Sequence, residues 1–195
     1  MPIAFALADR LARLSPRSWV DPPKSDGDPV WKWAAVALIV APAPDAILLI
    51  RRSERMGDPW SGHIALPGGR QDPLDPDLLE TAIRETREEV GIQLGRGNLM
   101  GSLEAVIPSS PVLPPIAVRP FVFLLDRRPA LALNSEVASA TWVEVDHLLQ
   151  PTNHHPVQLE VAGIPRVVQA YQLEEGVIWG LTERILTSLI DRIND

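Results

Sequence analysis

The sequence predicts an α+β fold in which a mixed β-sheet carries helices on both faces. Short apolar segments rich in β-branched residues recur along the chain, and segments with helical periodicity are interleaved with them. At 195 residues, a single domain with one core is the default. The expected strands are residues 33–40, 46–50, 99–107, 116–125, 140–145, 157–161 and 166–170, and the expected helices are residues 3–14, 77–90 and 177–193.

The first 30 residues are expected to form a helix and a loop that pack on this domain. Apolar residues recur at helical spacing, at Ile3, Leu7, Leu11 and Leu14. The stretch that follows is rich in Pro, Asp and Ser, which is typical of a loop. The segment has no basic leader, and charged residues interrupt its apolar run, so a packed helix is favoured over a signal sequence. We therefore expect one domain over residues 1–195 and a cytoplasmic location.

The next elements are a pair of strands and a glycine turn. Residues 33–40 and 46–50 flank the segment Ala-Pro-Ala-Pro-Asp, so they are expected to pair across that turn. A short apolar segment, residues 64–66, then leads into Pro67-Gly68-Gly69. Both glycines lack a Cβ atom, which lets the backbone come close to a metal ion or a phosphate.

Two further helices are predicted by their periodicity. The helix at 77–90 ends at Gly91, a residue that commonly terminates helices. In the helix at 177–193, one side carries Leu181, Ile185, Leu189 and Ile193. The strands expected at 99–107, 116–125, 140–145, 157–161 and 166–170 lie between these two helices.

Composition excludes several classes of function. The chain has no cysteine, so it has no disulfide scaffold, thiolate metal site or cysteine nucleophile. Its formal net charge of −7 argues against a nucleic-acid partner, because such proteins usually present a basic face. No stretch approaches the roughly 20 apolar residues needed to span a bilayer, so we expect no membrane partner. A small phosphorylated substrate bridged by metal cations fits this charge.

The segment with the most chemical information is the helix at 77–90. At about 100° per residue, Glu85, Glu88 and Glu89 form one acidic arc beside an apolar arc that is expected to face the core. Arg84 lies one turn before Glu88, where an ion pair can hold the carboxylate in place. A solvated acidic face is the ordinary explanation of such a run. The alternative is a site for a hard divalent cation, since Mg²⁺ or Mn²⁺ prefers oxygen ligands and relieves the repulsion.

The surroundings of these glutamates resemble the Nudix box of the Nudix hydrolase family. That pattern is a Gly, five residues, Glu, seven residues, then Arg-Glu-apolar-any-Glu-Glu-any-Gly-apolar. Residues 84–92 match its second half, with Thr86 at the apolar position. The first half departs from it, because Asp75 stands in place of Glu and eight residues separate it from Arg84. The resemblance implies a Nudix-type α/β/α sandwich with a mixed sheet.

The resemblance also implies roles for individual residues. Glu85, Glu88 and Glu89 would bind divalent metal ions, and the carbonyl oxygen of Gly69 would join them. Arg84 would orient the carboxylates without touching the metal. Asp75 would support the loop and is left out of the ligand set. Gly68 is expected to contact the substrate.

A second resemblance lies before the box, to the motif of coenzyme A pyrophosphatases. The matching residues are Leu48, Leu49, Arg52, Ser53, Gly62 and Pro67-Gly68-Gly69, and the late segment 178–182 is also similar. Three features depart from the motif: Ile50 replaces Thr, Leu66 replaces Phe, and Gly57 stands in the place of a second arginine with one additional residue before Gly62. Arg55, two positions earlier, is a candidate for that missing basic group.

Basic residues in this flank are candidates for phosphate recognition. Arg51, Arg52 and Ser53 are predicted to bind the substrate, and Arg52 is predicted to pair with the 3′-phosphate of coenzyme A. For Arg51, plain solvent exposure is an equal alternative. His63 precedes the glycine turn and is within reach of a phosphate, although such a histidine is more often an ordinary surface residue.

Glu136 is a candidate general base. It lies on an expected loop before the strand at 140–145, and Nudix hydrolases often place an additional glutamate in such a loop. A carboxylate without strong metal bonding is the better base, because ligation lowers its pKa. A glutamate of the box and a purely structural role for Glu136 stay open.

The sequence therefore predicts an enzyme that cleaves the diphosphate of coenzyme A or acyl-coenzyme A with Mg²⁺ or Mn²⁺. The products would be 3′,5′-ADP and phosphopantetheine or its acyl derivative. The alternatives are a Nudix hydrolase of another nucleoside diphosphate derivative, such as ADP-ribose, a nucleotide sugar or a dinucleotide, and a Nudix-fold ligand sensor without catalysis. The presence of all three box glutamates argues against the sensor. The oligomeric state is left open, with a homodimer as one option.

Overall fold

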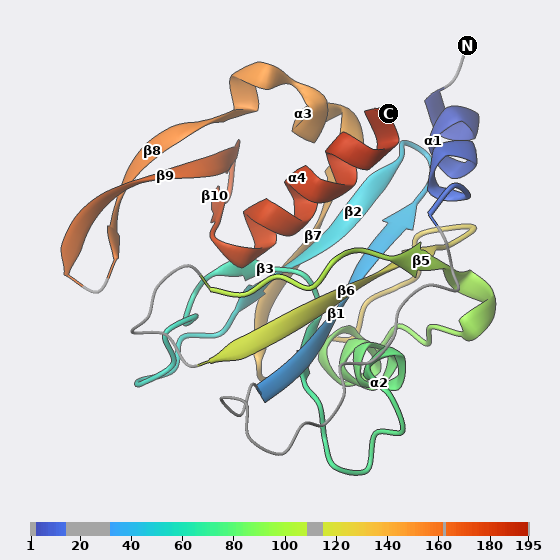
Figure 1. The fold of residues 1–195 in the computed structure, drawn as a ribbon, viewed down its shortest axis with the longest axis horizontal. Helices are drawn as coiled ribbons and strands as arrows, with labels where there is room; N and C mark the ends of the chain where they lie inside the picture. The colour runs from blue at the N-terminus through green and yellow to red at the C-terminus, as the bar shows by residue number, and fades with distance from the viewer. Residues whose placement is uncertain (1–2, 15–31, 109–114, 162, 195) are drawn as a thin grey trace.

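The computed structural model of the chain describes residues 3–14, 32–108, 115–161 and 163–194, and within them a seven-stranded mixed sheet forms the centre (Figure 1). The predicted loop at 15–30 lies outside these residues. The central sheet contains β1 (Lys32–Ala41), β2 (Ala46–Arg52), β3 (Ile64–Ala65), β4 (Gly68–Arg70), β5 (Leu99–Ser102), β6 (Ile116–Leu124) and β7 (Val137–Glu144). A second sheet contains β8 (His154–Val161), β9 (Ile164–Leu173) and β10 (Gly176–Trp179).

Strand β1 is the centre of the large sheet. It runs parallel to β6 and antiparallel to β2 and β4. The main path has the order β3-β2-β1-β6-β5, and β7 pairs with β2. β1 and β2 read as nearly continuous apolar runs because both of their faces are covered. The predicted mixed sheet is confirmed.

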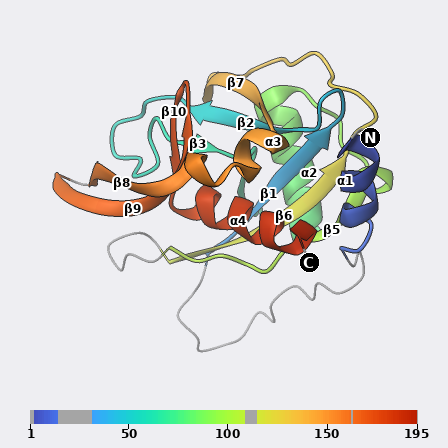
Figure 2. The same cartoon turned by 90° about the horizontal axis from the view of Figure 1, so that it is seen from above.

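Helices cover both faces of this sheet, as predicted. The α-helices are α1 (Ile3–Leu11), α2 (Leu78–Val90), α3 (Val145–Leu149) and α4 (Leu181–Asn194), and the short 3₁₀ helices are η1 (Arg96–Asn98) and η2 (Pro151–Asn153). Figures 1 and 2 show α2 and α4 on opposite sides of the sheet. Alternate residues of β2 therefore enter two cores: Leu48 and Ile50 pack with α2, whereas Ile47 and Leu49 pack with α4. In the described part of the chain, no helix is long and apolar enough to cross a membrane.

The N-terminal helix packs on the domain, as its apolar spacing predicts. Leu7, Leu11 and Leu14 are buried in the same core as α4. The Arg10 guanidinium donates a hydrogen bond to the carbonyl of Ile193 at 2.6 Å, so α1 is bonded to the last turn of α4. Figure 1 shows the C-terminal end of α4 next to α1.

The last helix was predicted four residues too early. Residues 177–179 belong to β10, which pairs with β9, and Gly180 has a φ of 71° that separates strand from helix. Valine, isoleucine and tryptophan favour a strand when a partner strand is available, and β9 provides one. From Leu181 on, the predicted apolar side is confirmed, with Ile185, Leu189 and Ile193 buried.

Two other expected strands have different boundaries in the structure, which their partner strands determine. The expected strand at 99–107 is paired with β6 only over β5, and Val106 makes a single bridge to Val118. Strand β7 begins at Val137, because it pairs with β2 along its length, and Val145 starts α3 instead of ending the strand.

Candidate active site

Helix α2 presents the predicted glutamates. The carboxylate of Asp77 accepts a hydrogen bond from the backbone N–H of Glu80 at 2.8 Å, which caps the start of the helix. Gly91 ends it in the left-handed region at a φ of 75°. Thr86, at the apolar position of the box, is fully buried, and its hydroxyl donates to the carbonyl of Ala82 at 2.7 Å. This local bond explains why a threonine is accepted in the core.

The glycine turn is held against the sheet and the helix by close packing. Gly68 has a φ of 148°, and a Cβ atom there would lie 2.3 Å from the carbonyl oxygen of Ala35 in β1. At Gly69, a Cβ atom would lie 2.5 Å from the carboxyl carbon of Glu85. The sequence argument attributed both glycines to a close approach by metal or phosphate. In the structure, the backbone of β1 requires a glycine at Gly68, whereas Gly69 lies against the carboxylate end of Glu85, and an approach of metal or phosphate to this turn stays a prediction.

Glu89 is the most buried of the three glutamates. It is 2% exposed, and its carboxylate accepts a hydrogen bond from the backbone N–H of Gly68 at 2.8 Å. Burial raises the pKa of Glu89 to about 7, and the charges of Glu85 and Glu136 act in the same direction. Gly68 is predicted to contact the substrate. In the structure, its backbone N–H is bonded to the carboxylate of Glu89.

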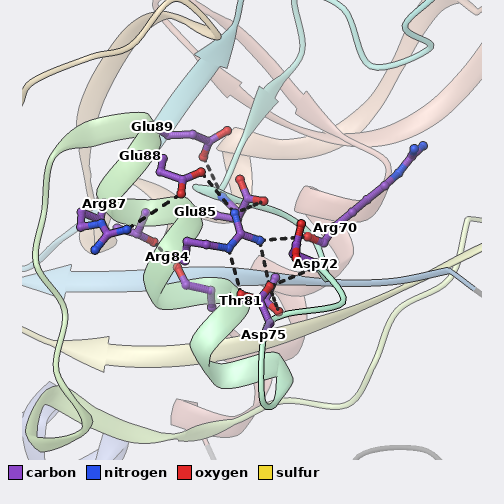
Figure 3. A network of polar contacts seen from close by, with 12 residues as sticks. Arg70, Asp72, Asp75, Thr81, Arg84, Glu85, Arg87, Glu88 and Glu89 are labelled. Carbon is purple, nitrogen blue, oxygen red and sulfur yellow. Dashed lines mark hydrogen bonds and ion pairs between the residues drawn. The ribbon is translucent and has the colours of Figure 1, made fainter. Parts of the chain in front are cut away.

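Arg84 is the centre of the polar network (Figure 3). Its Nε and Nη2 donate to the two carboxylate oxygens of Asp75, each at 2.9 Å. Its Nη1 donates to Glu85 at 2.9 Å and to Glu88 at 3.2 Å, and Nη2 also reaches the carbonyl of Arg70 at 3.2 Å. The ion pair that the sequence predicts between Arg84 and Glu88 is present. One guanidinium thus fixes two of the three glutamates relative to the loop.

Asp75 anchors this guanidinium from the loop before the helix. Its side chain is 7% exposed and also accepts a hydrogen bond from the Thr81 hydroxyl at 2.9 Å. The hydrogen bonds from Arg84 lower the pKa of Asp75 to about 2. Asp75 thus has the supporting position that the family resemblance implies. Its bidentate pairing with Arg84, nine residues away, is not evident from the spacing alone.

The remaining two glutamates differ in exposure. The side chain of Glu85 is 17% exposed, and that of Glu88 is 47% exposed. Burial raises the pKa of Glu85, while the charge and hydrogen bond of Arg84 oppose that effect. The acidic arc therefore runs from the buried Glu89 through Glu85 to the solvent at Glu88.

The donor chemistry of this cluster fits a hard divalent cation. Carboxylate oxygens of Glu85, Glu88 and Glu89 and the nearby backbone of Gly69 are the oxygen ligands that Mg²⁺ and Mn²⁺ prefer. Gly69 packs so closely on Glu85 that a Cβ atom would overlap the carboxylate. In the residues that the structure describes, no three acidic or histidine side chains already converge as metal ligands. The glutamates are instead bonded to Arg84 and to Gly68.

Arg52 lies on the α2 side of β2, near the acidic cluster. Its Nη2 forms an ion pair with Asp58 at 2.8 Å, and among the described residues its buried Nε has no hydrogen-bond partner. The charge of Arg52 acts to lower the pKa of Glu89, against the larger effect of burial. Burial lowers the pKa of His63, whose ring packs 4.7 Å from that of Trp179. Arg52 therefore lies near the glutamates with Asp58 as a partner that the sequence did not reveal, and its contact with substrate stays a prediction.

Arg51 and Ser53 join segments that are distant in sequence. The Arg51 guanidinium donates to the carbonyl of Gly62 at 3.0 Å and to the carbonyl of Glu175. The Ser53 hydroxyl donates to the carbonyl of Ser135 at 2.9 Å, and its backbone N–H donates to the carbonyl of Glu136 at 2.8 Å. These contacts give both residues a structural role, and their contact with substrate stays a prediction.

Glu136 directly precedes β7, as its predicted loop position requires. Its carboxylate pairs with Arg55 at 3.0 Å, and its charge raises the pKa of both Glu85 and Glu89, after the larger effect of burial. The structure therefore brings the candidate base next to the helix glutamates. Its role as a base stays a prediction.

Comparison with known proteins identifies the family. The NUDIX domain profile matches residues 31–162. An uncharacterized protein of Schizosaccharomyces pombe is 44% identical over 119 residues, which are 58% of this chain and 36% of that protein, so the chain spans about a third of that relative. The uncharacterized Nudix hydrolase NudL of Photorhabdus laumondii is 32% identical over 175 residues, 88% of this chain and 90% of that protein.

A solved structure supports the same conclusion on the fold. The MutT/nudix family protein from Enterococcus faecalis superposes with a TM-score of 0.64 at 16% identity, covering 90% of this chain and 66% of that chain. The chain therefore belongs to the Nudix domain family. The family places it among the Nudix hydrolases, a class of enzymes.

We expect Asp75→Asn to lower the free energy of unfolding at neutral pH by about 2 kcal/mol. The pKa of Asp75 falls from 3.8 to about 2 on folding, so the carboxylate stabilises the fold above its unfolded pKa. That contribution is lost as the pH falls through the folded pKa. Urea unfolding at pH 7, 5 and 3 measures the effect, which should be full at the first two values and about halved at pH 3.

The exposed Asp126 provides the matched control, since Asp126→Asn removes the same group at a position that forms no ion pair within the described residues. A difference between wild type and Asp75→Asn that does not change with pH would contradict the assigned role of the ion pair.

Proposed function

We propose that the protein is a metal-dependent diphosphatase that cleaves coenzyme A or acyl-coenzyme A to 3′,5′-ADP and phosphopantetheine or its acyl derivative. The observation that carries the proposal is the juxtaposition of the three helix glutamates with the Gly68-Gly69 turn and Arg52. Such a site offers anionic ligands for cations and a guanidinium for phosphate within one small region. A nucleoside diphosphate with its metal ions has the complementary charges.

Glu85, Glu88, Glu89 and the carbonyl of Gly69 would hold Mg²⁺ or Mn²⁺ in this proposal. The metal would supply Lewis-acid stabilisation of the diphosphate and an acidified water. Arg84 keeps Glu85 and Glu88 on the side of the helix that faces the glycine turn. The backbone N–H of Gly68 holds the carboxylate of Glu89 against the same turn. The protein thereby fixes its ligands before the substrate arrives.

Glu136 is the better candidate for the general base. Glu85, Glu88 and Glu89 are the proposed metal ligands, and ligation lowers the pKa of a carboxylate and makes it a weaker base, whereas Glu136 lies outside that set and pairs with the half-exposed Arg55. A carboxylate that is near the cluster and open to solvent has a water molecule within reach. Water would attack one phosphorus, Glu136 would take its proton, and the bridging oxygen would leave with the electron pair.

The coenzyme A assignment is supported by the residues before the box. Arg52 occupies the position of the motif's arginine and lies on the α2 side of β2. In the late segment 178–182, the ring of Trp179 packs against the ring of His63. Gly57 explains the missing second arginine, because its φ of 83° is strained for any side chain. ADP-ribose or another nucleoside diphosphate derivative is the alternative, favoured by the departures at Ile50, Gly57 and Leu66. A homodimer and a cytoplasmic location stay predictions.

A substrate panel tests the activity directly. We expect coenzyme A and its acyl derivatives to be cleaved faster than ADP-ribose, nucleotide sugars and dinucleotides in the presence of Mg²⁺ or Mn²⁺, with products identified by mass. Water labelled with oxygen-18 shows which product receives the new oxygen. Cleavage of ADP-ribose alone would contradict the coenzyme A assignment and retain the diphosphatase class.

Glu89→Gln is expected to lower kcat by at least about 100-fold while the fold is retained. The amide keeps an acceptor for the N–H of Gly68 and ends the burial of a charge, but it removes an anionic metal ligand. Kinetics on the cleaved substrate and thermal unfolding measure the two effects. Glu80→Gln, on the first turn of the same helix and paired with Arg96, is the control that should keep its activity. Full activity of Glu89→Gln would rule out this metal site.

Arg52→Ala tests phosphate recognition. The sequence predicts a contact with the 3′-phosphate, but the closeness of Arg52 to Glu89 favours the diphosphate instead. We therefore expect KM to rise by about 10- to 150-fold for coenzyme A and for dephospho-coenzyme A alike, as for loss of a charge-assisted pair. A larger rise for coenzyme A would restore the contact with the 3′-phosphate.

A further inference from the structure

An exposed ion pair connects the candidate base to the loop before the box. Arg55 Nη2 lies 3.0 Å from Glu136 Oε1, and the two side chains are 49% and 43% exposed. Arg84, by contrast, is 25% exposed and bonded to three carboxylates. The Arg55 pair is thus weakly held, because a solvent-exposed ion pair changes the equilibrium between its paired and unpaired states by only about 1.5- to 5-fold.

The backbone of Glu136 is fixed although its side chain is accessible. Its carbonyl accepts from the N–H of Ser53 at 2.8 Å, and its N–H donates to the side chain of Asn134 at 2.8 Å. The N–H of Asn134 in turn donates to the carbonyl of Glu89 at 3.1 Å. This chain of bonds ties Glu136 to the end of β2 and to the end of α2. A change of partner therefore requires only rotation of the side chain.

Arg55 is anchored in the same way. Its N–H donates to the Ser61 hydroxyl at 2.8 Å, and its carbonyl accepts from the N–H of Asp58 at 3.2 Å. The loop is closed further by Asp58, which also pairs with Arg52. The guanidinium of Arg55 is consequently a half-exposed positive charge at the edge of a site with four carboxylates, and its backbone is held in place.

We propose that Arg55 exchanges partners during the reaction: it holds Glu136 in the free enzyme and pairs with a phosphate of the substrate in the complex, which releases Glu136. The inference rests on the proposed diphosphatase site and adds a role for a residue outside the box. A doubly charged diphosphate is a stronger partner for a guanidinium than one exposed carboxylate. Binding of substrate thus frees the base only when there is a bond to cleave.

The exchange predicts a specific kinetic pattern for Arg55. Arg55→Ala should raise KM by about 10-fold, because a phosphate contact is lost, and change kcat by less than about threefold, because Glu136 is then already free. Arg55→Lys should recover part of the KM, since an ammonium also pairs with phosphate. Arg96→Ala, which removes an exposed arginine paired with Glu80 at 2.8 Å, is the matched control and should leave both constants unchanged. An unchanged KM, or a loss confined to kcat, would overturn the exchange.

A binding experiment separates this inference from the choice of substrate. The probe is α,β-methylene-ADP with Mg²⁺, which carries a nucleoside diphosphate that cannot be hydrolysed, so its result does not depend on cleavage of coenzyme A. Calorimetry on wild type, Glu136→Gln, Arg55→Ala and the double variant measures the coupling. Glu136→Gln should tighten binding about two- to fivefold more when Arg55 is present than when it is alanine. Equal tightening in both backgrounds, or no binding by any variant, would overturn the proposal.

Discussion

The arrangement of the site depends on the guanidinium of Arg84. Three glutamates on one helix face repel one another, and without a counter-charge this repulsion would destabilise α2. Arg84 supplies that charge, and its opposite edge is bound by both oxygens of Asp75 in the preceding loop. Planar bidentate geometry fixes orientation as well as distance, which a lysine at this position would not do. The loop, the glycine turn and the helix are thereby held as one unit.

Most of the fold could be predicted because its signals are local. Helix α2 was expected at 77–90 and occurs at Leu78–Val90, since its periodicity, its Asp77 cap and Gly91 all lie within a few residues. The parallel pairing of β1 with β6 could not be predicted from local signals, because the paired residues are about 80 positions apart in the sequence. The early start assigned to the last helix is a related case. Residues 177–179 favour a strand locally, but they form one because β9 lies beside them, and that neighbour is not evident from the local sequence.

The site residues also divide into those that the local sequence predicts and those whose contacts are distant in sequence. The resemblance to the Nudix box implies that Glu85, Glu88 and Glu89 are metal ligands, and the structure brings Gly68 and Gly69 against two of them. The partners of the basic residues could not be predicted in this way. Arg51 bonds the carbonyl of Glu175, 124 positions away, and Arg55 pairs with a glutamate 81 positions away. Side-chain partners at such separations are determined by the packing of β2 with β7 and with the second sheet.

Two classes of arginine follow from these contacts, and burial distinguishes them. Arg84 is mostly buried, bonds three carboxylates and a carbonyl, and would leave those groups unpaired if it moved. Removing one partner of a buried pair is strongly destabilising, whereas an exposed pair contributes at most about 1 kcal/mol. Arg55 belongs to the second class because half of its side chain faces solvent. A site that must keep its metal ligands rigid and still admit an anionic substrate needs both classes, one to fix the carboxylates and one whose partner can be exchanged.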